Sequence, residues 1–199
     1  MSEIIVSLEH PKLKKVYLRP LEKSDMKKCS RWENDPIARK YISTAFFPSV
    51  SSLEKWYEGQ NENTKRIELA IVTKKKNIHI GNIKIADIDW INRRGTTDAL
   101  IGEKEYWGRG YGTEAKLLLL KHAFDILGLE KICAEVTVIN PRSKRYLEKT
   151  GYKEEGYLRR HYFAEGKMID AYIMALFRED FYPIWKKYVG VKENERNLQ

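Results

Sequence analysis

Alternating apolar and polar residues dominate the middle of the chain, and this period of two predicts β-strands. The segment 78–88 is the clearest case, because Ile83 and Ile85 share one face of a strand and the even-numbered residues share the other. The same reasoning predicts six further strands, at 15–20, 67–73, 96–101, 131–139, 152–163 and 168–177. The pattern therefore predicts a fold built on one central sheet.

Apolar residues at helical spacing lie between several of these strands. Leu117, Leu120, Phe124 and Leu127 form one stripe of a helix that ends at Gly128. Four further helices are predicted, beginning at or near Ser24, Ser51, Asn140 and Arg178. This order of elements predicts an α/β (α+β) fold in a single domain over residues 1–188, followed by a polar tail over 189–199.

The composition narrows the class of protein. The chain has 199 residues, of which 42% are hydrophobic, enough to bury a core and to exclude a disordered or collagen-like chain. Its longest apolar runs, 117–120 and 171–177, fall far short of the roughly 20 residues that a membrane span needs. Two distant cysteines and no visible secretory signal predict a cytoplasmic protein without a disulfide framework or a metal site.

The chain carries a formal charge of +9, which attracts phosphate groups on a nucleic acid or a cofactor. The basic residues are scattered, however, and the one dense run, at 74–76, lies between two predicted strands. A solvated hairpin turn explains that run better than a nucleic-acid patch. We therefore expect no specific nucleic-acid partner.

A glycine-rich loop, Trp107-Gly108-Arg109-Gly110-Tyr111-Gly112, leads directly into the helix that carries the leucine stripe. Glycines let the backbone approach a ligand, and the free N–H groups of a helix N-terminus attract a phosphate. The spacing is not the G-x-G-x-x-G of a dinucleotide site, and the P-loop pattern is absent. A coenzyme A pyrophosphate loop and a simple helix-capping turn remain as alternatives.

Three motifs in order resemble the GNAT superfamily of N-acetyltransferases: the loop 106–115, the Asn-led segment 140–152, and the opening segment 18–35, which is similar to the ribosomal-protein-type branch. The resemblance covers roughly residues 16–180. It implies a mostly antiparallel sheet of six or seven strands flanked by helices, and acetyl-CoA as the acetyl donor. The cofactor-binding residues that it implies are Leu100, Ile101, Trp107, Gly108, Arg109, Gly110, Tyr111, Gly112, Thr113, Asn140, Ser143 and Tyr146.

Acetyl transfer needs a neutral amine, and deprotonating a lysine-like amine at pH 7 costs about 4–5 kcal/mol. A carboxylate acting directly or through water can take that proton, and Asp98, Glu103 and Glu135 are the candidates, although Glu103 is better explained as a solvated surface charge. Thr96 stands where the superfamily often has an acidic residue. The resemblance implies that a backbone N–H of Leu100 or Ile101 polarises the thioester carbonyl, and that Tyr146 protonates the departing thiolate.

The same resemblance places Trp32, Asn34, Asp35 and, more weakly, His161 beside the acceptor. Any primary amine satisfies the chemistry: the branch implies a protein N-terminus, and polyamines, amino sugars and antibiotics are alternatives. A coenzyme A-binding module without activity and a nucleic-acid binder are hypotheses from other classes. A homodimer is implied by resemblance alone.

Overall fold

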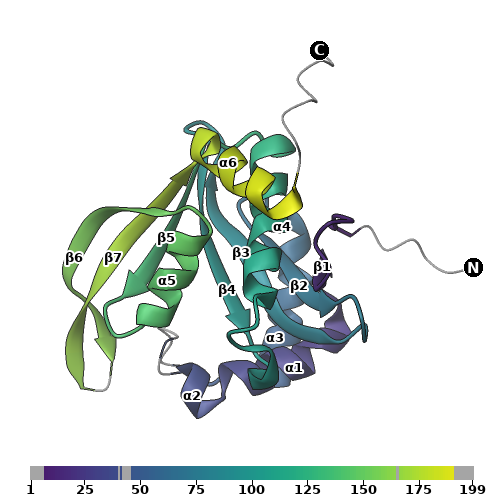
Figure 1. The fold of residues 1–199 in the computed structure, drawn as a ribbon. Helices are drawn as coiled ribbons and strands as arrows, with labels where there is room; N and C mark the ends of the chain where they lie inside the picture. The colour runs from purple at the N-terminus through teal and green to yellow at the C-terminus, as the bar shows by residue number, and fades with distance from the viewer. Residues whose placement is uncertain (1–6, 40, 42–45, 165, 191–199) are drawn as a thin grey trace, which may run out of the picture.

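A computed structural model describes residues 7–39, 41, 46–164 and 166–190. These residues form a seven-stranded sheet, with strand order β1-β2-β3-β4-β5-β7-β6 (Figure 1). Neighbouring strands are antiparallel except β4 and β5, which are parallel. The strands are β1 Val16–Pro20, β2 Ile67–Thr73, β3 His79–Asp89, β4 Arg94–Ile101, β5 Lys131–Thr137, β6 Lys153–Ala164 and β7 Lys167–Phe177. The predicted α/β class and mostly antiparallel sheet are confirmed.

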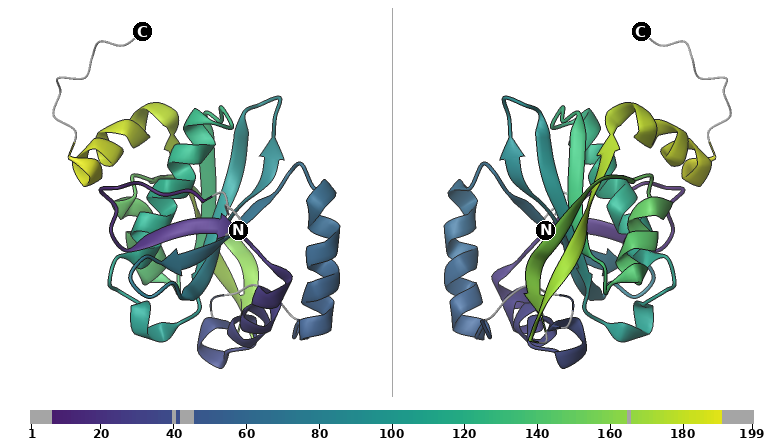
Figure 2. Two further views of the ribbon diagram at one scale, coloured as in Figure 1. Left: turned by 90° about the vertical axis from the view of Figure 1, so that its right-hand side faces the viewer. Right: turned by 90° about the vertical axis from the view of Figure 1, so that its left-hand side faces the viewer.

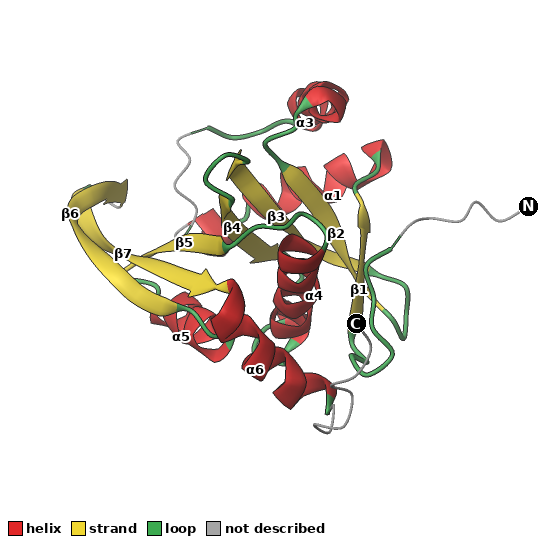
Figure 3. Cartoon of the chain, turned by 90° about the horizontal axis from the view of Figure 1, so that it is seen from above, coloured by secondary structure: helices red, strands yellow, loops and turns green. Residues whose placement is uncertain are grey.

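Helices cover both faces of the sheet (Figure 2). Seen from above, α4, α5 and α6 lie on one face, and α1 and α3 on the other (Figure 3). Each face has its own buried cluster: the larger is centred on the α4 leucines, and the smaller lies around Met26, Cys29 and Trp32 of α1. The helices are α1 Met26–Glu33, α2 Pro36–Arg39, α3 Val50–Glu58, α4 Tyr111–Asp125, α5 Pro141–Lys149 and α6 Arg178–Val189.

Two predicted helix starts are wrong. Ser24 lies inside a short 3-10 turn, Lys23–Asp25, where Glu22 and Asp25 form a reciprocal capping box before α1 begins. Ser49, rather than Ser51, caps α3, because its hydroxyl accepts a hydrogen bond from the Ser52 N–H at 3.1 Å. In both places several polar residues stand together, and the local pattern does not select among them. Residues 191–199, most of the predicted tail, lie outside the described residues.

A buried polar network fastens α1 to the sheet. The Asp25 carboxylate, whose side chain is 8% exposed, receives hydrogen bonds from the Arg19 guanidinium of β1 at 2.7 and 3.0 Å. The His79 Nδ1 of β3 lies 2.9 Å from the same carboxylate. The network continues through the Asn82 side chain, which contacts His79 and donates to the Cys29 sulfur of α1. It therefore joins two strands and the helix that carries the predicted acceptor residues.

We expect Asp25→Asn to lower the free energy of unfolding by about 3 kcal/mol at pH 7, because it leaves the Arg19 cation and the His79 ring without their buried carboxylate. Burial alone would raise the pKa of Asp25, but hydrogen bonds from His79, Arg19 and the Glu22 N–H hold it well below its usual range. This stabilisation is complete above the unfolded pKa of about 3.9 and is lost as the pH falls through the lower folded pKa.

Urea denaturation of both proteins at pH 7 and pH 3 tests this expectation. The difference between them should shrink at pH 3, where the wild type begins to lose the stabilising term. Glu58→Gln is the matched control, because its ion pair with Lys23 is solvent-exposed and should contribute little. An equal effect of the two substitutions at pH 7 would contradict the role given to Asp25.

Candidate active site

The site is organised around the point where β4 and β5 separate. Only 94–96 of β4 pair with 131–133 of β5, and beyond Thr96 and Cys133 the two strands diverge (Figure 1). The Arg93 carbonyl accepts hydrogen bonds from the start of β5. At the other end of β4, the Gly102 N–H donates a hydrogen bond to the carbonyl of Ile80 in β3. Because backbone direction alternates along a strand, the backbone groups of residues 97, 99 and 101 face the opening. The backbone N–H and C=O groups of Leu100 therefore face β3, whereas those of Ile101 face the opening.

Some of these exposed backbone groups have partners and others lack one. The Ala99 N–H donates to the Asp98 carboxylate at 2.8 Å, and the Trp107 indole donates to the Ile101 carbonyl at 2.6 Å. Within the described part of the chain, no hydrogen bond to the Ile101 N–H is seen. A donor of this kind at a strand edge can bind a carbonyl oxygen, which is the role that the resemblance implies for Leu100 or Ile101.

The glycine loop ends in the first turn of α4. Gly110, at φ +83°, is the N-cap and provides no side-chain hydrogen bond, so the first N–H groups of the helix are left for a ligand. Gly108 is also left-handed, at φ +71°. A Cβ on Gly112 would meet no heavy atom closer than 3.7 Å, so the protein's own packing does not require glycine there. The loop fits an anion that approaches the backbone closely.

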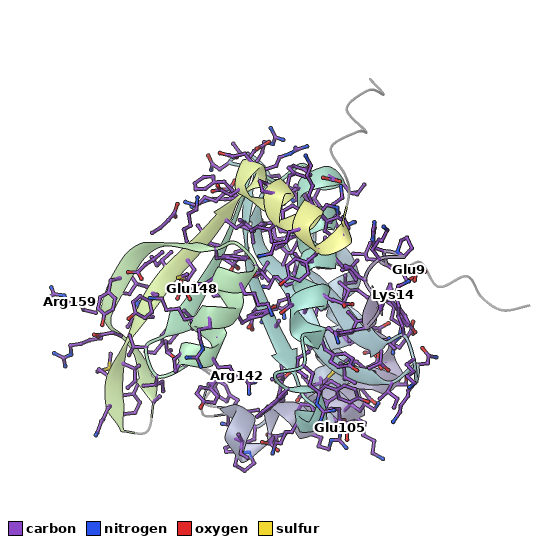
Figure 4. The ribbon with its side chains drawn as sticks, in the orientation of Figure 1. Glu9, Lys14, Glu105, Arg142, Glu148 and Arg159 are labelled. Atoms are coloured by element: carbon purple, nitrogen blue, oxygen red, sulfur yellow. The ribbon has the colours of Figure 1, made fainter. Side chains whose placement is uncertain are left out.

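Cationic side chains surround this loop. The Arg142 guanidinium of α5 lies 4.3 Å from the Trp107 ring centroid, and Figure 4 labels Arg142 near the lower end of the opening. Arg109 is exposed within the loop. The Lys15 ammonium lies 5.4 Å from the Tyr111 ring, and its Cε would be 3.5 Å from a Cβ on Gly110. Sequence reasoning missed Lys15, because it precedes the loop by about 95 residues and carries no local signal.

The start of α5 forms the opposite wall. Asn140 is its N-cap, as predicted, and its side chain accepts from the Ser143 N–H at 3.1 Å. The Tyr146 hydroxyl donates to the Gly112 carbonyl at 3.3 Å, and this contact joins α5 to the glycine loop. Burial, with Tyr152 and Asp98 nearby, raises the pKa of Tyr146 well above its usual value, so the hydroxyl stays protonated.

The other face of the sheet carries a row of charges. Glu68, Lys84 and Asp98 stand side by side across β2, β3 and β4, and Lys84 lies 3.2 Å from Asp98. Asp98 is 70% exposed in the opening, and the nearby positive charge of Lys84 lowers its pKa. Arg66 is paired with Glu68.

Glu33, the last residue of α1, adds a carboxylate beside this row. Burial and the negative charge of Glu68 raise the pKa of Glu33. No ion pair to the Glu33 carboxylate is found among the described residues. Its neighbours Trp32, Asn34 and Asp35 were predicted beside the acceptor, but the sequence did not single out Glu33, because a helix-terminal glutamate is ordinarily solvated.

The predicted residues around Glu33 hold the backbone in place. Trp32 is 2% exposed, and its indole donates to Glu103 at 3.2 Å. Asn34 donates to the Pro48 carbonyl at 2.9 Å, and its buried Oδ1 has no partner in the described part of the chain. Asp35 caps α2 and pairs with Lys104 at 2.7 Å. Trp32 and Asp35 also line an open pocket between α1 and the loop before α4.

Glu135 projects from β5 on the other side of the opening. It accepts a hydrogen bond from the Tyr162 hydroxyl of β6, and His161 lies 3.7 Å from the same carboxylate. Burial and the bond to Glu135 raise the pKa of Tyr162. Glu135 of β5 and His161 of β6 are thus brought together, across the opening from Asp98.

Comparison with known proteins explains this architecture. Residues 15–153 match the family described as "Acetyltransferase (GNAT) domain". The chain belongs to this family. An uncharacterized N-acetyltransferase, p20, of Bacillus licheniformis is 28% identical over 82% of this chain and 93% of its own length. The spermidine N(1)-acetyltransferase of Vibrio cholerae is 26% identical over 82% of this chain and 94% of its own length.

The same fold occurs in a crystal structure of spermidine N-acetyltransferase from Vibrio cholerae in complex with coenzyme A and spermine. It has a TM-score of 0.80 and 24% identity, and the match covers 85% of this chain and 99% of that one. As a member of the GNAT family, the protein is an N-acetyltransferase that uses acetyl-CoA. The hypothesis of a coenzyme A-binding module without activity is set aside.

Two findings bear on the other expectations. No described helix is long and apolar enough to cross a membrane. Within the described ranges, no group of three or more His, Cys, Asp or Glu side chains is placed to hold a metal ion.

We expect Gly112→Val to weaken coenzyme A binding at least tenfold, about 1.4 kcal/mol, while the protein stays folded. The added side chain has room in the protein and would project at the first turn of α4, where the backbone is open to a phosphate. Isothermal titration calorimetry with coenzyme A measures the affinity, and thermal melting reports the fold. Gly59→Val is the control, because a Cβ there meets nothing within 4 Å and Gly59 follows α3, outside the glycine loop. Unchanged affinity in Gly112→Val would remove the loop from the binding site.

Proposed function

We propose that this enzyme acetylates a primary amine of a cationic small molecule of the polyamine class. The observation that carries the proposal is the excess of carboxylates on the acceptor face of the opening. Glu33, Glu68 and Asp98 outnumber the two cations beside them, Lys84 and Arg66, and Glu33 has no ion pair among the described residues. An acceptor ammonium would relieve this repulsion, since an opposite charge favours the ionised carboxylate.

The relatives support the same class of acceptor. Those whose names state an acceptor are spermidine N(1)-acetyltransferases, including the Vibrio cholerae enzyme and one from Escherichia coli that is 25% identical. The protein N-terminus that the ribosomal-protein-type resemblance implied has no such support. It becomes an alternative outcome of the acceptor test.

The donor would lie along the α4 and α5 face. The glycine loop, from Trp107 to Thr113, would bind the pyrophosphate through its backbone, with Arg109, Arg142 and Lys15 adding positive charge. Asn140 and Ser143 would border the pantetheine arm, and the Ile101 N–H would receive the thioester carbonyl. Bound acetyl-CoA supplies the acetyl group: the acceptor nitrogen bonds to the acetyl carbon as the carbon–sulfur bond breaks, and that electron pair goes to sulfur.

The proton of the acceptor ammonium would leave toward the carboxylates. Asp98 is a weak base because Lys84 lowers its pKa, so its role would be to hold the cation or a water molecule. Glu33 has a raised pKa and is better matched to accept a proton near neutral pH. Glu135, bonded to Tyr162, would orient the acceptor from the β5 side together with His161.

We expect Glu33→Gln to raise the KM for spermidine about tenfold or more and to leave the KM for acetyl-CoA unchanged, because it removes the unpaired acceptor-side carboxylate. Coenzyme A release is measured with spermidine, an uncharged-chain primary amine and an N-terminal peptide. Glu148→Gln, an exposed change on α5, is the matched control. Faster turnover of the peptide than of spermidine would overturn the polyamine proposal and favour a protein N-terminus. No release with any amine would overturn the amine acceptor altogether.

A Tyr146→Phe substitution separates chemistry from packing. The hydroxyl has one long hydrogen bond, to Gly112 at 3.3 Å, so stability should change by less than about 1.5 kcal/mol. If Tyr146 protonates sulfur, kcat should fall roughly 10²-fold, the low end for general acid catalysis, because a thiolate is a good leaving group. Affinity for acetyl-CoA should be nearly unchanged, since the hydroxyl acts in the transition state. A folded Tyr146→Phe protein with normal kcat would show that Tyr146 is only a packing residue.

A further inference from the structure

A lysine is buried at the point where β4 and β5 separate. Lys116 of α4 is 1% exposed, and its ammonium donates to the Thr97 hydroxyl at 2.7 Å. Thr97 is the first β4 residue beyond the last pair with β5. Its hydroxyl also lies 2.9 Å from the Tyr152 hydroxyl, which follows α5. The Lys116 amine therefore belongs to a chain of polar groups that spans the base of the opening.

The surroundings of this amine contain aromatic rings and no partner carboxylate. The Lys116 nitrogen lies 5.6 Å from the ring centroids of both Tyr146 and Tyr152. No described carboxylate lies within ion-pair distance of it, and Asp98 acts on it only from the opposite face of β4. Burying a cation without a nearby anion destabilises the folded protein, so a functional role would explain why a lysine occupies this position.

The proposed function leaves negative charge on the departing sulfur. Among the described residues, no cation other than Lys116 is buried at this place. The thiol pKa is about 8.5, so sulfur carries the electron pair of the broken bond until it is protonated. The group assigned to that protonation is Tyr146, whose pKa is raised well above its usual value. Proton transfer from this hydroxyl to a free thiolate is uphill. A positive charge near both groups, in a region of low dielectric, would stabilise the thiolate before the transfer and the tyrosinate after it.

We propose that the Lys116 ammonium is a positioning charge for this reaction: held by Thr97 beneath Tyr146, it stabilises the thiolate of coenzyme A as the acetyl group leaves. This inference rests on the proposed function. In the step, the acceptor nitrogen bonds to the acetyl carbon and the carbon–sulfur electron pair passes to sulfur. The Tyr146 proton then passes to sulfur. The acceptor ammonium gives up two protons as the amide forms: the first passes to the carboxylates before attack, and the second, lost from the nitrogen after attack, restores the Tyr146 hydroxyl by way of solvent. Lys116 forms no bond and keeps its three protons.

The charge on Lys116 depends on pH in the physiological range. Burial lowers the pKa of Lys116 to about 7, and Asp98 opposes this. The other titratable groups that face it are Tyr146 of α5 and Tyr152, and Cys133 of β5 lies beyond Tyr152. Because the charged form is the useful one, the assistance is present below this pKa and is lost as the pH rises through it. Bound anionic coenzyme A should shift the loss to higher pH.

The decisive experiment measures the lysine itself. With 13C-labelled lysine, the Lys116 signal is identified by its absence in Lys116→Met, and its pKa is followed by NMR in the free protein, with coenzyme A, and with desulfo-coenzyme A. All phosphates are present in both ligands, and only the first has the sulfur. We expect coenzyme A to raise the Lys116 pKa by at least one unit more than the desulfo ligand does. Equal shifts would mean that Lys116 responds to phosphates alone, and would overturn the proposal.

Steady-state kinetics of Lys116 variants are the second experiment. Lys116→Met should fold, because methionine fills the site without a charge, and should lower kcat for spermidine at pH 7 at least tenfold with little change in the KM for acetyl-CoA. The falling limb of the wild-type kcat/KM profile near pH 7 should disappear. Lys116→Arg should recover part of the loss, and Lys121→Met, on the exposed side of α4, should change nothing. A Lys116→Met protein with altered melting but an unchanged pH profile would assign Lys116 a structural role only.

The NMR titration and the kinetics together distinguish a failure of the proposed function from a failure of the inference about Lys116. The NMR titration needs no turnover, so it decides the role of Lys116 even if the acceptor is not a polyamine. If the wild type acetylates none of the amines tested while the sulfur-dependent shift is present, the proposed function fails and the inference about Lys116 stands.

Discussion

The separation of β4 from β5 is the constraint on which the rest of this structure depends. A parallel pair that is joined for only three residues leaves backbone donors and acceptors without strand partners along the remainder of β4. In a buried sheet such groups are costly, so they need ligands or side chains to satisfy them. The Asp98 carboxylate and the Trp107 indole already satisfy two of them, on opposite faces of the same strand. The opening is therefore a partly satisfied edge in the middle of the sheet.

Two buried polar networks hold the walls of this opening. The Asp25 network ties α1 to β1 and β3, which positions the helix that ends at Glu33. The Lys116 network ties α4 to β4 and to the segment after α5. They differ in electrostatic balance. Asp25 has the Arg19 cation as a partner and a lowered pKa, whereas Lys116 has a hydroxyl and two aromatic rings. The Asp25 network is therefore suited to holding α1 rigidly against the sheet, and the Lys116 network to responding to the charge of a bound ligand.

The sheet also separates cationic from anionic side chains around the opening. On the α4 and α5 face, the glycine loop and the side chains of Lys15, Arg109 and Arg142 suit an anionic donor. On the α1 face stand the carboxylates of Glu33, Glu68 and Asp98, which the proposed function assigns to a cationic acceptor. The overall charge of +9 conceals this arrangement, because it sums over both faces. The opening between β4 and β5 connects the two faces of the sheet, so two molecules can reach the same point from opposite sides.

The sequence by itself predicted the strands, most of the helix starts and the loop that is proposed to bind the donor. Strand periodicity, the glycine loop and the Asn140 cap are local features whose physical causes lie within a few residues, so contiguous motifs were enough to locate them. Only the tertiary structure decided which distant residues meet. Lys15 reaches the loop from the segment before β1, Glu33 joins carboxylates from β2 and β4, and Lys116 turns from a helical lysine into a buried charge. Those outcomes depend on strand pairing and helix packing, which the period of a segment does not encode.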